Sequence, residues 1–250
     1  MSSPFDLDGQ VILVTGAGRG IGLACARAVA DAGAEAVLMS RTGSELETAA
    51  ADIRAAGGKA RTMVCDVADT AAVRDAIGSL DRLDALINNA GTAKHAHFLE
   101  VDEDNYDQVM ALNGRAAFFT AQAAARKIAD GGRGGAIVNM SSQMGHVGGE
   151  RRSVYCMSKH GLEGLTKVMA IELGPSNIRV NTLAPTFVET PLTRPFFDNP
   201  EFVAWLERNI LMGRVAQPEE IAAAAVYLCS PAASMVTGTC LKVDGGWTAH

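Results

Sequence analysis

The sequence has no apolar run that approaches about 18 residues, so no segment predicts a membrane-spanning helix. Basic residues are not in excess either, and the net charge of −6 and pI near 5.4 disfavour nucleic acid or an anionic membrane as a partner. The first ten residues lack the basic start and apolar core of a signal peptide. With 48% hydrophobic and 20% charged residues the composition is that of a globular protein, and we expect a cytoplasmic enzyme.

Cysteine is scarce, and its pattern favours neither disulfide pairs nor a metal site. The five cysteines are an odd number, contain no CxxC pair and have mostly apolar neighbours, which predicts small buried side chains in a reducing compartment. The sequence also lacks an HExxH motif and any cluster of Cys and His, so it predicts no metal site. The cysteines are Cys25, Cys65, Cys156, Cys229 and Cys240.

Short apolar runs alternate with alanine-rich stretches along the chain. The runs are apolar on both faces, which indicates parallel strands buried between helices. We expect one α/β domain over residues 1–250: a doubly wound, Rossmann-like parallel sheet of seven strands with helices on both faces. Gly33, Gly57 and Gly174 stand where three helices should end. The expected strands are residues 10–16, 34–40, 59–65, 84–90, 135–141, 178–184 and 239–245.

Residues 190–214 interrupt this alternation. The segment holds three prolines and four large aromatic side chains but no strand pattern. Its place after the sixth expected strand is typical of a substrate lid. The same features would also suit an ordinary helical excursion that packs on the body of the domain.

The glycine-rich segment TGAGRGIG, residues 15–22, follows the first expected strand and opens the next helix. Gly16, Gly20 and Gly22 let the backbone turn sharply and approach a pyrophosphate, while the helix N-terminus offers N–H donors and the positive end of its dipole. A glycine-rich turn alone is often merely structural. Its position between a strand and a helix indicates a dinucleotide site.

The choice between NAD(H) and NADP(H) should depend on the end of the second expected strand, where an acidic residue would bind the ribose 2′-OH of NAD(H). The chain instead has Ser40 and Arg41, with no carboxylate before Glu45, and it carries Arg19 inside the glycine turn. Two guanidinium groups without an opposing carboxylate suit a 2′-phosphate. We therefore predict NADP(H) rather than NAD(H), although solvated arginines would give the same pattern.

Two further segments follow strands on the side of the sheet where cofactors bind. Asp66 and Val67 come after the third strand and could bind adenine through a carboxylate and a backbone N–H. An Asp in this position is more often a helix cap, and Asp69 is better placed to be one. Residues 88–91, NNAG, end the fourth strand and would either contact the cofactor or form a polar turn.

Tyr155 and Lys159 lie four residues apart in SVYCMSKHG, so they share one face of a helix. A free phenol has a pKa of about 10, and lowering it by about three units takes about 4 kcal/mol. One ammonium at about 4 Å supplies about this much at an effective dielectric constant of about 20. The pair suits proton transfer at neutral pH, although many amphipathic helices carry a Tyr and a Lys without this role.

Two more polar residues extend this candidate site. Ser142, 13 residues before Tyr155, ends the strand AIVNMS, where its hydroxyl could hold a substrate oxygen and stabilise developing negative charge. Asn113 precedes a glycine inside the helical stretch VMALNGRAAFF, and that glycine costs about 1 kcal/mol. The cost predicts a kink that frees a carbonyl able to hold a water, unless Asn113 is simply tolerated there.

In this order and spacing the motifs resemble those of the short-chain dehydrogenase/reductase family, in its single-domain branch of about this length. The resemblance covers about residues 9–246. One departure is Thr186, because the family usually has a glycine after Pro185. The matching motifs are TGAGRGIG, DV at 66–67, NNAG at 88–91, Asn113, Ser142 within SSQMG, YCMSK at 155–159, RVNTLAP and TGTCLKVDGGW.

The resemblance implies a catalytic tetrad. Tyr155 would be the general acid/base and Ser142 would orient the substrate. Lys159 would bind the nicotinamide ribose and tune Tyr155, and Asn113 would anchor a water in the proton relay. The family's spacing to the tyrosine selects Ser142 over Ser141. The implied cofactor contacts are Gly16, Arg19, Gly20, Ile21, Gly22, Ser40, Arg41, Asp66, Val67, Asn89, Ala90, Gly91, Tyr155, Lys159, Pro185, Val188 and Thr190, the last binding the carboxamide.

The implied activity is the interconversion of a carbonyl and an alcohol with NADP(H). One alternative is an NAD-linked sugar/polyol or 3-oxoacyl-type dehydrogenase/reductase that uses the same residues. Another, from a different class, is a catalytically silent nucleotide-binding protein. The family also suggests a homotetramer or homodimer that associates through helices near residues 102–129 and 153–173.

The sequence does not identify the substrate, because two of its segments favour different substrate classes. The loop GHVGGERRS, residues 145–153, is polar and would suit a sugar, a polyol or a keto acid, unless it is a solvated loop or a subunit contact. The aromatic side chains of residues 190–214 would suit an apolar substrate. They are Phe196, Phe197, Phe202 and Trp205.

Overall fold

Seven parallel strands form one sheet, in the order β3-β2-β1-β4-β5-β6-β7, in the computed structural model, which describes residues 3–249. Six lie within the expected runs and β6 extends one residue beyond its run, so the predicted fold class is confirmed. The order reverses between β1 and β4, and ligands bind at such switch points in open α/β sheets. The strands are β1 (Val11–Thr15), β2 (Glu35–Ser40), β3 (Lys59–Val64), β4 (Ala85–Asn88), β5 (Gly135–Met140), β6 (Ile178–Pro185) and β7 (Cys240–Val243).

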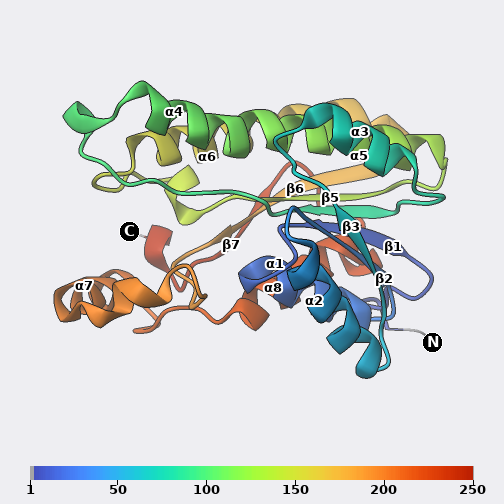
Figure 1. The fold of residues 1–250 in the computed structure, drawn as a ribbon, viewed down its shortest axis with the longest axis horizontal. Coiled ribbons are helices and arrows are strands. Elements are labelled where there is room, and N and C mark those ends of the chain that lie inside the picture. The colour runs from blue at the N-terminus through green and yellow to red at the C-terminus, as the bar shows by residue number, and fades with distance from the viewer. Residues whose placement is uncertain (1–2, 250) are drawn as a thin grey trace.

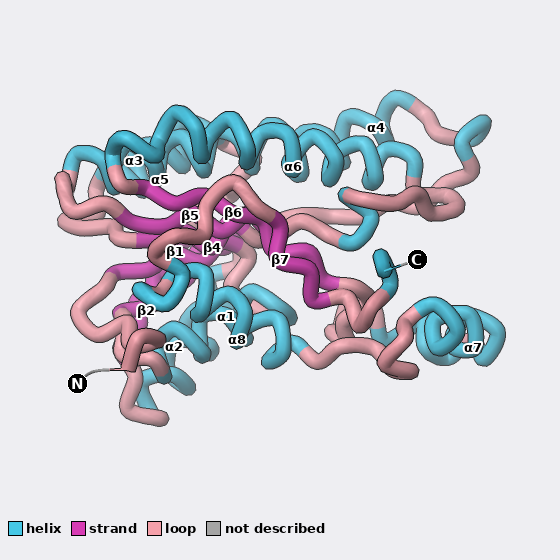
Figure 2. The backbone as a smooth tube through the Cα atoms, turned by 180° about the vertical axis from the view of Figure 1, so that it is seen from behind, coloured by secondary structure: helices cyan, strands magenta, loops and turns pink. Residues whose placement is uncertain are grey.

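Helices cover both faces of the sheet, with α3, α5 and α6 on one side and α1, α2 and α8 on the other (Figures 1 and 2). Within residues 3–249, no helix has the length and apolar composition needed to cross a membrane. The helices are α1 (Gly20–Asp31), α2 (Gly43–Ala55), α3 (Thr70–Gly78), α4 (Glu103–Met110), α5 (Ala117–Asp130), α6 (Ser153–Leu173), α7 (Pro200–Asn209) and α8 (Pro218–Cys229).

The central strands contribute to two cores because successive side chains point to opposite faces. In β1, Ile12 and Val14 pack with α1, α2 and α8, whereas Val11 and Leu13 pack with α3, α5 and α6. All four side chains are buried. This explains why the strands read as unbroken apolar runs rather than as alternating patterns.

All three predicted helix ends are confirmed, but only two of the glycines have the conformation expected at C′. Gly33 and Gly57 follow α1 and α2 with φ of 101° and 91°, the left-handed conformation that glycine adopts at little cost. α6 also ends at Gly174, but this glycine is the C-cap with φ of −54° rather than a left-handed C′ residue, and the chain continues there into a 3₁₀ turn. Asn177 takes the left-handed position instead, with φ of 57°.

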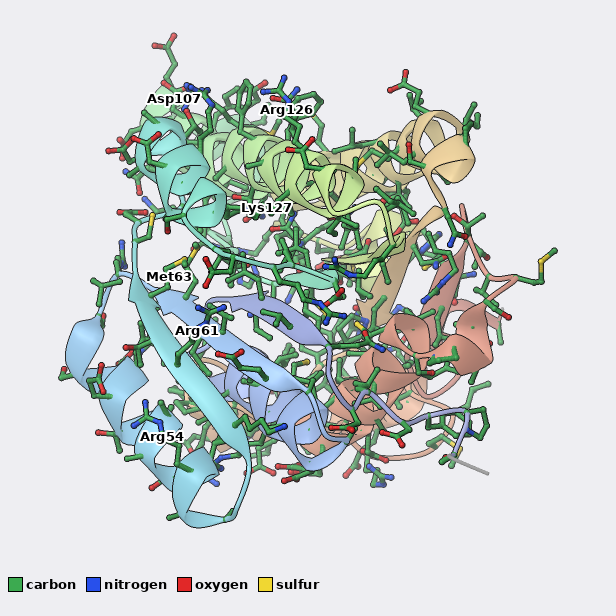
Figure 3. The ribbon with its side chains drawn as sticks, turned by 90° about the vertical axis from the view of Figure 1, so that its right-hand side faces the viewer. Arg54, Arg61, Met63, Asp107, Arg126 and Lys127 are labelled. Carbon is green, nitrogen blue, oxygen red and sulfur yellow. The ribbon has the colours of Figure 1, made fainter. Side chains whose placement is uncertain are left out.

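The edge strand β3 is shielded by charged side chains, as Figure 3 shows around Arg54 and Arg61. Arg61 Nε lies 2.9 Å from Glu35 Oε1 on the neighbouring strand. Arg54 Nε donates to the main-chain oxygen of Ala60 at 2.9 Å. Charges along an edge strand discourage pairing with a further strand, so the sheet ends here.

The segment 190–214 folds as a 3₁₀ turn (Arg194–Asp198) followed by α7, which lies beyond the sheet on the side of the C-terminus (Figure 1). Both ends of the excursion are held together at its base. Val188 and Ala216 form a parallel bridge, and Ala216 N donates to Phe187 O at 2.9 Å. A lid role for this segment stays a prediction.

Candidate active site

The glycine turn has the backbone that the sequence predicts. Gly16 and Gly20 have φ of 65° and 57°. A Cβ at Gly22 would lie 2.2 Å from the carbonyl oxygen of Gly16, so only glycine fits. Arg19 is the N-cap of α1 but makes no side-chain capping bond. The N-terminal N–H groups of α1 are therefore not capped by that side chain and can bind an anion.

The NNAG segment combines both of its expected roles. Asn88 is buried and structural, donating to Ala117 O at 2.9 Å and to Asn139 Oδ1 at 3.1 Å. Asn89 Nδ2 donates to Thr15 O at 2.9 Å and so ties the end of β4 to the start of the glycine turn. The rest of the segment faces the central cavity, which Asn89, Ala90 and Gly91 line.

One cavity of about 550 Å³ runs from the glycine turn to Tyr155 at the carboxyl ends of the strands. It brings together all the predicted site residues except Gly22 and Asn113. Gly22 packs behind the turn, and Asn113 acts from outside the cavity wall. The predicted residues that line the cavity are Gly16, Arg19, Gly20, Ile21, Ser40, Arg41, Asp66, Val67, Asn89, Ala90, Gly91, Ser142, Tyr155, Lys159, Pro185, Val188 and Thr190.

The far end of the cavity, beside the glycine turn, differs from the sequence prediction in its charge. Arg19, Ser40 and Arg41 line it as expected, but so does Glu45 from the first turn of α2. A Cβ at Gly18 would lie 2.8 Å from Glu45 Oε2, so the carboxylate rests against the glycine turn. The expectation that no carboxylate opposes the two arginines is therefore wrong, because α2 folds back over the turn.

Of the two nearby aspartates, Asp69 caps a helix and Asp66 lies at the cavity wall. Asp69 Oδ1 accepts from the N–H groups of Ala71 and Ala72 and caps α3. Asp66 Oδ1 accepts from Ala68 N at 2.9 Å, and its exposed carboxylate stays at the cavity wall with Val67. The cap assignment is confirmed for Asp69, and Asp66 keeps a position from which it can reach an adenine.

Thr186 occupies the position of the usual glycine without backbone strain. Among residues 3–249, the non-glycine residues with positive φ are Arg151 and Asn177, so Thr186 does not need glycine's freedom. Its N–H donates to Val243 O at 3.3 Å. Thr190 lies nearby over the glycine turn, where its Cγ2 is 3.5 Å from the position a Cβ would take at Gly20.

Tyr155 and Lys159 project from one face of α6, but the lysine does not pair with the phenol oxygen. Lys159 Nζ lies 5.7 Å from the centroid of the Tyr155 ring and donates to Met140 O at 2.7 Å. Burial lowers the pKa of Lys159 to about 8, although the Glu163 carboxylate opposes this. Burial also raises the pKa of Tyr155, and a hydrogen bond with Ser142 opposes that rise. The expected lowering of the phenol pKa by the ammonium is therefore not seen here.

The two neighbouring serines have different environments. Ser142 Oγ accepts from Met144 N at 3.1 Å and donates to Gln143 Oε1 at 2.8 Å. Ser141 Oγ is buried and finds no hydrogen-bond partner within the described part of the chain. Ser142 is thus held in a defined place beside Tyr155, and its expected catalytic role stays a prediction.

Asn113 produces the predicted irregularity, since residues Ala111–Ala116 form a π-helical turn between α4 and α5. Its side chain accepts from Thr92 N and donates to Thr92 O, both at 2.8 Å. Asn113 Nδ2 also lies 3.2 Å from Ser158 Oγ, which donates to Tyr155 O. Asn113 therefore positions the wall at Thr92 and the turn of α6 that carries Tyr155.

The substrate end of the cavity contains residues that sequence reasoning missed. Phe187 and His95 both line it, although neither belongs to a motif. Phe187 packs edge-to-face with Phe202 and Trp205 and tilted against Trp247, at centroid distances between 5.6 and 5.9 Å. These aromatic side chains pack mainly on one another, so they offer less apolar surface to a substrate than their number suggests.

Arg152 faces this end of the cavity without a carboxylate partner. Its guanidinium lies 5.6 Å from the Phe187 ring centroid and donates to Glu150 O at 2.9 Å. None of the ion pairs found among residues 3–249 includes it. Burial lowers the pKa of Arg152, and burial together with Arg152 lowers the pKa of His95. The substrate end thus carries an uncompensated positive charge.

Comparison with known proteins places the chain in one family. A family model described as enoyl-(acyl carrier protein) reductase matches residues 16–248. D-threitol dehydrogenase of Mycolicibacterium smegmatis is 43% identical over 98% of this chain and 95% of its own length. L-xylulose reductase of Bos taurus is 40% identical, covering 97% of this chain and 98% of its own length.

A solved structure also matches along its whole length. It is a gluconate 5-dehydrogenase from Burkholderia cenocepacia in complex with NADP and tartrate. It superimposes with a TM-score of 0.95 at 37% identity, covering 99% of this chain and 98% of that one. Family membership and the fold are thus established together.

Proposed function

The chain belongs to the short-chain dehydrogenase/reductase family, and on this premise we propose that it interconverts a hydroxyl and a carbonyl group of a hydroxylated small molecule with NADP(H). The observation that carries the proposal is the single cavity that joins the glycine turn to Tyr155 and Lys159. A nucleotide site and a proton-transfer site in one cavity suit hydride transfer. A catalytically silent protein would have no use for the second of them, and the relatives with a stated activity are dehydrogenases and reductases.

The proposal gives each side chain at the reacting centre a task. A nicotinamide bound here would supply or accept the hydride. Tyr155 Oη would donate its proton to the carbonyl oxygen in reduction and recover it from the hydroxyl in oxidation. Ser142 Oγ would hold the same substrate oxygen and stabilise its negative charge. Lys159, fixed by Met140 O, would keep a positive charge beneath the Tyr155 ring.

A dinucleotide fits the remainder of the cavity. The glycine turn and the N–H groups of α1 would hold its pyrophosphate, and Asp66 and Val67 would bind the adenine. Arg19 and Arg41 would bind a 2′-phosphate, and NADP in the Burkholderia cenocepacia structure supports this choice. A panel of substrates assayed with both cofactors tests the preference, and a higher kcat/KM with NADH than with NADPH would contradict it.

The charge at the substrate end favours a sugar acid or keto acid over a neutral polyol. Arg152 is the group best placed to bind a carboxylate, because it faces the cavity and is not neutralised by an ion pair. A guanidinium binds carboxylates through charge-assisted, often bidentate hydrogen bonds. Relatives of this chain act on both classes, since their names include threitol and gluconate.

The substrate class can be tested with two matched variants. Arg152→Met should lower kcat/KM for hydroxylated carboxylates at least tenfold, or about 1.4 kcal/mol, while leaving neutral polyols within about threefold. Arg151→Met removes the neighbouring guanidinium, which is exposed and does not line the cavity, and should leave both substrate classes unchanged. Equal losses for acids and polyols in Arg152→Met would overturn the assignment of a carboxylate site.

We further propose that the protein is a cytoplasmic homotetramer or homodimer. All five cysteines are free, which suits a reducing compartment. Several large apolar side chains on α4, α5 and α6 are exposed, as expected for a subunit interface. Light scattering that gives a monomer would contradict the association. The exposed side chains are Tyr106, Phe118, Met157, Val168 and Ile171.

A further inference from the structure

Three side chains with metal-binding atoms meet behind the active site, although they lie far apart in the sequence. His146 follows the turn after Ser142, Glu163 lies on α6, and Cys240 begins β7. His146 Nε2 is 3.0 Å from Cys240 Sγ and 3.3 Å from Glu163 Oε1. All three ligand atoms lie within 4.8 Å of one another. Each comes from a different element, so the cluster is a product of the fold.

Hydrogen bonds alone do not satisfy this cluster. The His146 Nε2–H and the weaker Cys240 S–H donor both lie near Glu163 Oε1, but neither contact meets hydrogen-bond geometry there. If Nε2 carries no proton, its lone pair faces the carboxylate oxygen. Glu163 is buried, and Oε1 has no hydrogen-bond partner of acceptable geometry within residues 3–249. A buried, unpaired carboxylate oxygen is costly unless a cation compensates it.

The separations are close to those of a metal centre. Zinc binds His nitrogen and carboxylate oxygen at about 2.0–2.2 Å and Cys sulfur at about 2.3 Å, with tetrahedral geometry. Those bond lengths place nitrogen and oxygen about 3.3–3.5 Å apart, and nitrogen and sulfur about 3.6 Å apart. The observed 3.3 Å for His146 and Glu163 agrees. The 3.0 Å between His146 and Cys240 would open by about half an ångström.

A neighbouring residue orients the carboxylate as metal sites require. Thr182, fully buried on β6, donates from Oγ1 to Glu163 Oε2 at 2.8 Å. This bond occupies one carboxylate oxygen and leaves Oε1 directed at the cluster. Ligating carboxylates in metal sites are held by such outer hydrogen bonds. His146 and Cys240 are only partly buried, so an ion has a route from solvent.

From this geometry we propose that His146, Glu163 and Cys240 form a binding site for a divalent ion of the zinc class, with a fourth position left for water. The mixed nitrogen, sulfur and oxygen donors select zinc or cobalt rather than magnesium or calcium. Binding releases the Cys240 thiol proton to solvent. The site joins β7 to α6 one helical turn beyond Lys159. The sequence predicts no metal because its signals are local, whereas these three residues meet only in the fold.

Cobalt titration of the full chain, after treatment with a chelator and desalting, tests the proposal directly. One equivalent of Co²⁺ should produce the near-ultraviolet charge-transfer band of a thiolate–cobalt bond and the visible bands of a tetrahedral centre. Zn²⁺ should displace Co²⁺, abolish these bands and raise the melting temperature, which should go on rising with the logarithm of the free Zn²⁺ concentration. Absence of the thiolate band with excess Co²⁺ would overturn the proposal.

Variants separate this site from chance binding elsewhere. Cys240→Ser should remove the thiolate band, and His146→Gln should weaken Zn²⁺ binding at least about 100-fold. Thr182→Val, which leaves all three ligands in place, should weaken it about 10- to 100-fold. Cys156→Ser alters a half-buried thiol outside the cluster and should change nothing. A band that persists in Cys240→Ser, or vanishes in Cys156→Ser, would place the metal elsewhere. Circular dichroism of each variant confirms that it is folded.

Discussion

Lys159 Nζ donates a 2.7 Å hydrogen bond to the main-chain oxygen of Met140. The bond joins α6 to the last residue of β5, two residues before Ser142. It therefore fixes the ammonium, the serine and Tyr155 relative to one another at the edge of the sheet. The lysine stabilises the site by holding its parts in register as well as by its charge.

Tyr155→Phe should lower kcat/KM by about 10²–10⁴-fold, because it removes the hydroxyl that exchanges a proton with the substrate. The ring stays in place, so NADPH binding followed by nucleotide fluorescence should be nearly unchanged. If Tyr155→Phe keeps more than a tenth of wild-type turnover, another group must supply the proton.

Ser142→Ala should reduce kcat by about 10²–10³-fold, as expected when a donor to a developing oxyanion is lost. Ser141→Ala is the matched control, because its hydroxyl is buried without a partner and its removal should be neutral or slightly stabilising. Steady-state assays and thermal melting of both variants make the comparison. A large loss in Ser141→Ala with an active Ser142→Ala would reverse the two roles.

The lowered pKa of Lys159 predicts how the stability of the fold depends on pH. Its pKa falls from 10.5 to about 8 on folding because the ammonium is buried. Between these values the unfolded chain binds more protons than the native one, so the free energy of unfolding rises with pH across this window. Relative to Lys159→Met, the wild type should gain up to about 3 kcal/mol from below pH 8 to pH 10.5. Urea unfolding of both proteins measures this difference, and parallel curves would exclude the lowered pKa.

Glu45 should weaken the preference for NADPH, because its carboxylate shares the far end of the cavity with Arg19 and Arg41. Glu45→Gln should raise the ratio of kcat/KM for NADPH to that for NADH by about fivefold, equivalent to about 1 kcal/mol. Arg41→Ala should lower the same ratio at least about tenfold. Both ratios come from initial rates with each cofactor. A ratio that falls in Glu45→Gln would show that this carboxylate does not oppose a 2′-phosphate.

Asn113→Ala should destabilise the fold by about 1–2 kcal/mol, since it leaves the half-buried N–H and C=O of Thr92 without their partner. The damage should extend to catalysis, because Asn113 also supports the turn that carries Tyr155. Gln108→Ala on α4 is the control, as its side chain is exposed and bonds only to Asp104 within the described chain. Equal stability of the two variants in urea would contradict the positioning role of Asn113.

Much of the fold could be read from the sequence because its determinants are local. Glycines that follow strands or end helices have conformational needs that few other residues meet, as Gly16 and Gly33 show. Gly174 lacks the left-handed conformation expected of a C′ glycine, because a 3₁₀ turn extends the end of α6 and moves the left-handed position to Asn177. Such an extension depends on how the chain reaches β6, which no short pattern records.

In the candidate site too, some features follow from the local sequence and others only from the packing of distant elements. Tyr155 and Lys159 share a helix face by spacing alone, so the sequence determined their proximity. Only the packing of separate elements decided that Glu45 would line the same cavity as the two arginines and that Phe187 would pack against Phe202. Burial likewise decided the direction of the Tyr155 pKa. Sequence thus determines what depends on neighbouring residues, whereas solvent exclusion and long-range contacts set charge and environment only once the chain is folded.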